Sequence, residues 1–71
     1  MSAVALNVKR IIKERGYKQG AIAKKAGYKE KTFSNMLNGR KIISEQDIVQ
    51  LTNVLEVTPN DLLDAKSFSA I

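Results

Sequence analysis

The chain has 71 residues, which is enough for one small domain with a single hydrophobic core and too few for a second domain. It contains neither cysteine nor histidine, so disulfides and the usual zinc sites are excluded and we expect no metal and no cofactor. The net charge is +5, which favours a negatively charged partner.

The positive charge is concentrated in the first part of the chain. Residues 1–41 hold eleven of the twelve Lys and Arg residues but two of the seven acidic ones, a net charge of +9, whereas residues 42–71 carry −4. Contacts between basic side chains and nucleic-acid phosphates release counterions and supply affinity that is independent of sequence. This distribution indicates a polyanionic partner, although a chance excess of lysine in a small domain would give the same total.

The apolar stretch at residues 2–6 is short and precedes Lys9 and Arg10, the reverse of the order in a signal peptide. No apolar run approaches the length of a membrane span. We therefore expect a soluble cytoplasmic protein without a membrane partner.

A first helix is predicted from about Val4 to Arg15, ending at Gly16, with Tyr17 packed under the turn that follows. Its expected buried face has helical spacing and consists of Val8, Ile11 and Ile12.

Two short amphipathic patterns between Gln19 and Gly39 meet at Gly27, where a sharp helix exit requires a positive φ that glycine adopts cheaply. Their apolar faces are formed by Ile22, Ala23 and Ala26 and by Phe33, Met36 and Leu37. This pattern predicts a helix-turn-helix, in which the second helix, Lys29–Leu37, enters a DNA major groove.

The sequence after this motif predicts two more helices. Asn38-Gly39 suits a left-handed cap and is followed by the basic loop Arg40-Lys41. Ser44 to Asp47 resembles a capping box, and Thr58-Pro59 gives a second helix start. The residues expected to complete the core from these helices are Ile48, Leu51, Leu55, Leu62 and Leu63.

The segment from Val8 to Leu63 resembles the phage Cro and lambda-repressor type (XRE-type) helix-turn-helix family. The residues that carry the resemblance are Gln19, Ile22-Ala23, Gly27, Thr32-Phe33-Ser34, Leu37-Asn38-Gly39-Arg40 and Val57-Thr58-Pro59-Asn60-Asp61-Leu62-Leu63. The resemblance implies an all-α fold, a compact five-helix lambda-repressor-like DNA-binding domain over residues 1–66. Residues 67–71 are then a flexible or dimer-contacting tail.

Two positions depart from the family pattern. Gly20 stands where a good helix former is usual, at a cost of about 1 kcal/mol relative to alanine. Ala26 is smaller than the usual aliphatic residue, and we expect Tyr28 or Phe33 to fill the space.

The resemblance places Glu30, Lys31 and Asn35 at base-reading positions. Lysine donates to guanine O6 or N7, glutamate accepts from cytosine N4, and asparagine bonds adenine. Glu30 is the doubtful member, because phosphates repel a carboxylate unless it meets a donor or pairs with a lysine such as Lys31. The residues expected to contact DNA phosphates are Gln19, Lys29, Ser34, Asn38, Arg40 and Lys41.

Other residues of the motif are expected to make no direct contact with bases. Lys24 and Lys25 are expected to give long-range attraction only, and Tyr28 is more consistent with a core position than with stacking on a nucleotide. Gln19 would be an ordinary solvated glutamine if no phosphate lies at the start of its helix.

We interpret the chain as a sequence-specific regulator of transcription, a repressor of phage, mobile-element or bacterial origin acting on a double-stranded DNA operator. The alternative is an antitoxin-like or adaptor module that binds a protein through its acidic second half and apolar tail. An enzyme is not expected, since the carboxylates are dispersed along a chain too short to enclose a substrate, and no small-molecule ligand is evident. We expect a homodimer, which could form only on DNA, with Phe68 and Ile71 of the tail as contact candidates.

Overall fold

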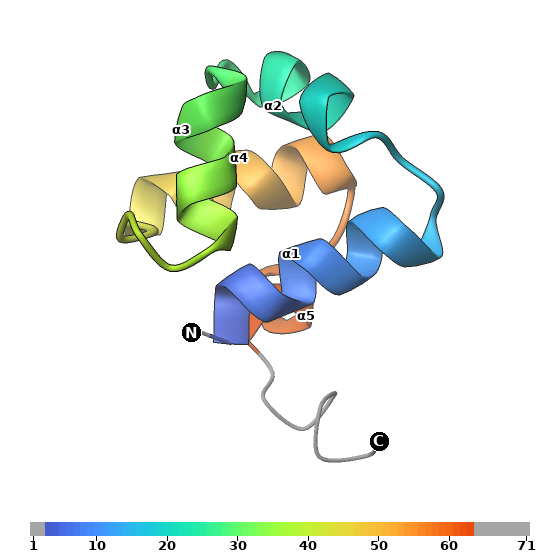
Figure 1. Cartoon of the computed structure of the whole chain (residues 1–71). Coiled ribbons are helices and arrows are strands. Elements are labelled where there is room, and N and C mark those ends of the chain that lie inside the picture. Colours follow the sequence, from blue (N-terminus) through green and yellow to red (C-terminus); the bar gives the residue numbers. More distant parts are fainter. Residues whose placement is uncertain (1–2, 64–71) are drawn as a thin grey trace.

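The computed structural model describes residues 3–63, which form a small all-helical domain (Figure 1). The helices are α1 (Ala3–Glu14), α2 (Gln19–Ala26), α3 (Glu30–Leu37), α4 (Glu45–Leu55) and α5 (Pro59–Leu63). The predicted all-α class with five helices is therefore confirmed for the described part of the chain. The predicted tail, including Phe68 and Ile71, lies outside it. Among residues 3–63, no helix has the length and apolar character needed to cross a bilayer.

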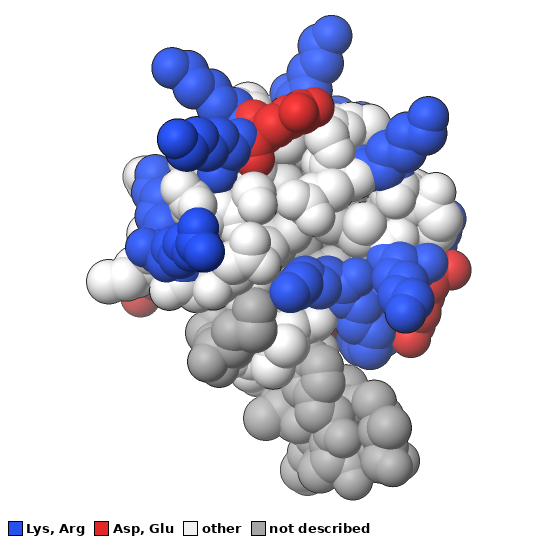
Figure 2. All heavy atoms as spheres, viewed as in Figure 1, with Lys and Arg blue, Asp and Glu red and all other residues white. Residues whose placement is uncertain are grey.

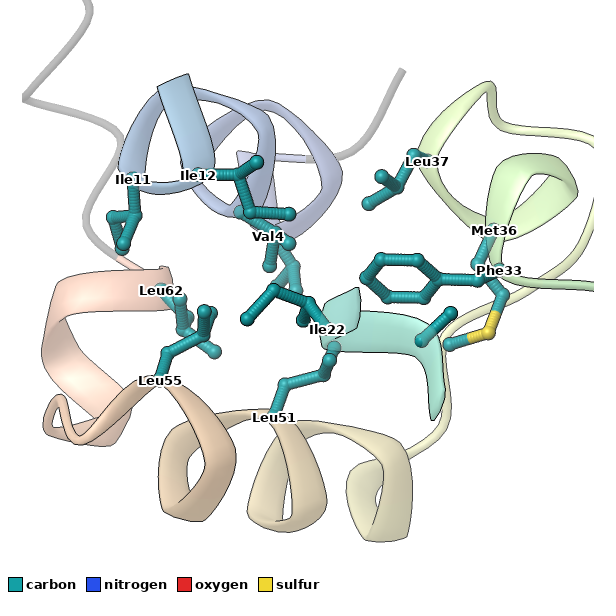
Figure 3. Packing of buried hydrophobic residues seen from close by; sticks show 12 residues of the cluster. Val4, Ile11, Ile12, Ile22, Phe33, Met36, Leu37, Leu51, Leu55 and Leu62 are labelled. Atoms are coloured by element: carbon teal, nitrogen blue, oxygen red, sulfur yellow. The ribbon is translucent and has the colours of Figure 1, made fainter. Parts of the chain in front are cut away.

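All five helices surround one core. α1 packs against α3, α4 and α5, while α2 packs against α3 and α4. Figure 3 shows side chains from each helix pointing into the shared interior, with Phe33 of α3 and Leu51 of α4 near its centre. Both are fully buried. Burial of a large apolar side chain contributes about 1.5–3 kcal/mol, so this core holds the α2–α3 pair without a disulfide.

The predicted helix ends are confirmed at both glycines of the motif. Gly27 has φ 84° and ends α2, and its N–H donates to the carbonyl of Lys24. Gly39 has φ 78° and follows the last residue of α3 by two positions. These left-handed residues let the chain turn within a few residues after each helix.

Two reciprocal caps fix the starts of the last two helices; the Ser44–Asp47 capping box and the Thr58 N-cap were predicted, and the return bond of Asp61 is an addition. The N–H of Asp47 donates to Ser44 Oγ (3.2 Å), and the N–H of Ser44 donates to Asp47 Oδ2 (2.9 Å). The N–H of Asp61 donates to Thr58 Oγ1 (3.3 Å), and the N–H of Thr58 donates to Asp61 Oδ2 (2.8 Å). Each pair satisfies main-chain donors that a helix start leaves without partners.

Polar contacts join distant parts of the chain around the core. The fully buried Asn7 of α1 donates through Nδ2 to the carbonyl of Leu62 (2.7 Å). Tyr28, in the turn between α2 and α3, donates to Asp47 Oδ1 (2.5 Å), and its ring stacks on Phe33 with 5.8 Å between centroids. Gln50 of α4 donates to the carbonyl of Ala26 (3.3 Å). The turn of the motif is thereby attached to α4.

Two expectations about packing are wrong. Leu62 is fully buried but Leu63 is 52% exposed, because α5 is a single short turn of helix that can direct only one of two adjacent leucines into the core. Tyr17 is 40% exposed and not packed under the turn. Ile48 is half-buried at the edge of the core, and Tyr28 packs beside Phe33 as the small Ala26 suggested.

The caps make the fold sensitive to acid. Partial burial alone would raise the pKa of Asp47, but hydrogen bonds from Tyr28 and Ser44 lower it below its usual value. Hydrogen bonds from Thr58 lower the pKa of Asp61. A carboxyl with a lowered pKa in the folded state stabilises the fold above its unfolded pKa, about 3.9 for aspartate. This contribution is lost as the pH falls through the lower folded-state pKa.

We predict that the free energy of unfolding is nearly constant from pH 7 to 5 and falls below about pH 4. Asp47→Asn should lower it by about 1–2 kcal/mol at pH 7, because the amide replaces a charged acceptor of the Tyr28 and Ser44 bonds, and should also weaken the acid dependence. Urea titrations followed by circular dichroism at several pH values measure both effects.

Glu45→Gln is the matched control, since Glu45 occupies the same first turn of α4 but its side chain makes no hydrogen bond within residues 3–63. It should retain the acid dependence of the unmodified chain. Equal loss in both variants would contradict the assigned role of the Asp47 contacts.

Candidate nucleic-acid interface

The rotation of α3 about its axis is fixed by its buried side. Phe33, Met36 and Leu37 are 0–2% exposed and face the core. At 100° per residue, five of the six polar side chains of the helix and its cap, all except Thr32, lie within an arc of about 140° on the other side. These are Glu30, Lys31, Ser34, Asn35 and Asn38. α3 therefore presents a continuous polar face away from the core.

The three predicted base-reading residues all lie on this face, within the first two turns of α3. Glu30 and Lys31, in the first turn, are exposed, and Asn35, one turn later, is half-buried. Within residues 3–63, Asn35 uses its main-chain carbonyl to accept from the N–H groups of Arg40 (2.8 Å) and Lys41 (3.2 Å). Its side-chain amide makes no hydrogen bond there, which leaves both the donor and the acceptor for a ligand.

The predicted phosphate contacts border the same face. Arg40 and Lys41 are exposed, and their main-chain bonds to Asn35 hold the basic loop against the end of α3. Asn38 donates through Nδ2 to Ser34 Oγ (3.3 Å), so these two side chains form one polar pair. Lys29 is the N-cap residue of α3 and is exposed. The structure thus brings these five residues to the rim of the base-reading group.

The start of α2 has the free donors expected of an anion-binding helix end. Gln19 is its first residue and is exposed, and the N-cap residue Lys18 makes no side-chain cap. The first turn contains no acidic residue of its own. Unpaired N–H groups and the positive end of the helix dipole favour an anion at this position.

Gly20 has a role that the sequence analysis missed. An alanine Cβ at this position would lie 2.3 Å from Glu30 Oε1, so the glutamate side chain occupies the space beside the α2 backbone. From the sequence, Gly20 is expected only to reduce the stability of its helix. Lys31 was considered as an ion-pair partner for Glu30, but residues 3–63 contain no such pair.

Positive charge surrounds the polar face of α3. Figure 2 shows Lys and Arg side chains projecting over α2 and α3 and over the far end of α1, with few acidic atoms among them. Glu14 is paired with Arg10 (3.0 Å), which neutralises one of the two acidic residues in the +9 segment. Electrostatic attraction can therefore act over the face shown in Figure 2, whereas the predicted base-reading groups lie on α3.

Tyr28 is not available as a nucleotide-stacking group. One face of its ring is stacked on Phe33, its hydroxyl is bonded to Asp47, and partial burial together with that carboxylate raises its pKa.

Ile42 is an exposed apolar residue that the sequence pattern did not indicate. It is 88% exposed, next to a pocket of about 440 Å³ between the start of α1 and the loop after α3. Within the part described, no three acidic side chains approach closely enough to bind a metal ion.

Comparisons with known proteins agree with this arrangement. The family model described as a helix-turn-helix domain matches residues 6–65, which include α2 to α5 and all but the first three residues of α1. Searches among curated proteins and solved structures found no significant match. Since the family model covers most of the chain, and α2 and α3 have the expected hinge at Gly27, the chain belongs to the family of helix-turn-helix domains, which bind DNA.

Proposed function

We propose that this domain is a sequence-specific regulator of transcription that places α3 in the major groove of an operator. The observation that carries the proposal is the polar face of α3, which points away from the core and is bordered by the free start of α2 and the basic loop. We further propose that the chain is a cytoplasmic repressor of the XRE or Cro-like type, acting by occupying its site. Such a mechanism needs no ligand-sensing domain.

In this mode Glu30, Lys31 and Asn35 contact base edges and specify the operator sequence. Gln19, Lys29, Ser34, Asn38, Arg40 and Lys41 contact phosphates and fix the position of α3 in the groove. Selection of binding sites from random duplex DNA tests the proposal as a whole. A reproducible short motif supports it, and recovery of unrelated sequences contradicts it.

We predict that binding to the selected duplex depends strongly on salt. Five or more phosphate contacts per chain give a slope of log K against log salt concentration steeper than about −4. Fluorescence anisotropy with a labelled duplex at about 50–300 mM salt measures it. A slope near zero would show that phosphate contacts do not supply the affinity.

Asn35→Ala and Arg40→Ala should separate sequence preference from affinity. Loss of the Asn35 amide should reduce the preference at one base pair by about 1–3 kcal/mol, whereas loss of the Arg40 side chain should weaken binding to all sequences alike and reduce the salt slope by about one. Competition binding with single-base operator variants measures both.

Asn53→Ala is the control for the Asn35 substitution, because Asn53 is an exposed asparagine on α4, outside the proposed interface. It should bind as the unmodified chain does. The docking orientation is wrong if Arg40→Ala changes the base preference while Asn35→Ala leaves it intact.

We also propose that two chains bind a two-fold operator, since a single α3 reads only a few base pairs. Exposed apolar side chains support self-association. Leu63 of α5 is 52% exposed and Val49 of α4 is 58% exposed, at the α4–α5 end where we place the partner chain. Recognition helices of such dimers lie one DNA turn apart, about 34–36 Å.

Deletion of Ser67–Ile71 and the substitution Leu63→Ser should each shift the assembly on a palindromic duplex from two chains toward one. The comparison variant Ile42→Ser changes an exposed apolar residue in the loop after α3 and should leave it at two. Sedimentation-velocity ultracentrifugation with and without duplex measures the assembly. A one-to-one complex of the unmodified chain would exclude the dimer. An effect of Ile42→Ser alone would indicate that the two chains contact each other through the loop after α3.

A further inference from the structure

Gly20 of α2 and Glu30 of α3 are in contact across the helix-turn-helix. A Cβ built on Gly20 would lie 2.3 Å from Glu30 Oε1 and 3.1 Å from its Cδ. The first distance is shorter than real Cβ contacts, so any residue except glycine would force the carboxylate to move. The missing side chain at position 20 therefore leaves the room that the carboxylate of Glu30 occupies.

The backbone itself does not require glycine at this position. The described glycines with positive φ are Gly16, Gly27 and Gly39, whereas Gly20 is an ordinary helical residue in the first turn of α2. Glycine in a helix is less favourable than alanine. The space that Glu30 occupies beside the α2 backbone is a structural reason for glycine at position 20 despite its low helix propensity.

Electrostatics favour the same position of the carboxylate. The first turn of α2 has no side-chain cap and no acidic residue, and Glu30 places its negative charge at this positive end of the helix. No Lys or Arg side chain within residues 3–63 forms an ion pair with Glu30. The carboxylate thus lies at the junction of α2 and α3 without a basic partner among the described residues.

We propose that Gly20 is a positioning residue that determines sequence specificity through Glu30. This inference rests on the proposed function, in which α3 lies in the major groove. In the space beside Gly20, the carboxylate accepts a hydrogen bond from the N4 amino group of cytosine and is repelled by the acceptor atoms of guanine and thymine and by N7 of adenine. A Cβ at position 20 would displace the carboxylate and so remove this discrimination. The pair therefore selects cytosine at the base pair facing the start of α3.

The test begins with the operator motif selected by the unmodified chain. Glu30→Ala identifies the base pair that Glu30 reads, and competition binding then measures the preference for cytosine there in Gly20→Ala. We expect Gly20→Ala to lose this preference by about 5- to 150-fold, the range of one good base contact. Preferences at the other base pairs should remain, and the double variant should behave as Glu30→Ala alone.

Two further variants separate positioning from a general change in α2. Ala21→Gly alters helix propensity at the exposed neighbour of Gly20 and should keep the cytosine preference. Glu30→Asp leaves α2 unchanged but shortens the side chain, and should lose the preference even if Gly20→Ala fails to fold. Circular dichroism reports folding in each case.

The inference is overturned if Gly20→Ala folds and keeps the cytosine preference, if it weakens all sequences equally, or if Glu30→Asp keeps the preference. Each of these outcomes leaves the proposed function standing, provided that the unmodified chain selects a motif. Failure of the unmodified chain to select any motif would instead overturn the proposed function, and the inference with it.

Discussion

The burial of one side of α3 is the constraint on which the rest of the structure depends. Phe33, Met36 and Leu37 are packed among residues of the other helices, and their burial leaves α3 one rotation about its axis. The opposite face is therefore available for a ligand. Because a well-packed interior resists even small changes of volume, the polar side chains of α3 keep a fixed direction relative to α2 and to the basic loop.

Most of the fold could be predicted because its signals are local. Gly27 and Gly39 adopt the left-handed conformations expected of helix ends, and Ser44 and Thr58 form the N-caps that the sequence predicted. Apolar residues three and four positions apart gave the buried sides of α1 and α3. Leu63 was mispredicted because the orientation of so short a helix depends on its tertiary packing, which the sequence pattern does not encode.

The residues of the candidate interface were predictable as a group, whereas the contacts that position them were not. The contact between Gly20 and Glu30 joins residues ten positions apart and depends on the angle between α2 and α3. The attachment of Tyr28 to Asp47 likewise depends on where α4 passes the turn. From the sequence, Gly20 could be assessed only by helix propensity and Asp47 only as a capping residue. In the structure, Gly20 of α2 also leaves room for Glu30 of α3, and Asp47 of α4 also accepts a hydrogen bond from Tyr28 in the turn.

Asp47 connects helix stability with the geometry of the DNA-binding motif. Its Oδ2 accepts from the N–H at the start of α4, and its Oδ1 accepts from Tyr28, whose ring is stacked on Phe33 of α3. One carboxylate thus fixes the start of α4 and the turn after α2, and through Tyr28 it supports the ring of Phe33 in α3. Loss of its charge would weaken both contacts together, so the support of the turn between α2 and α3 depends on a residue that lies outside the polar face of α3.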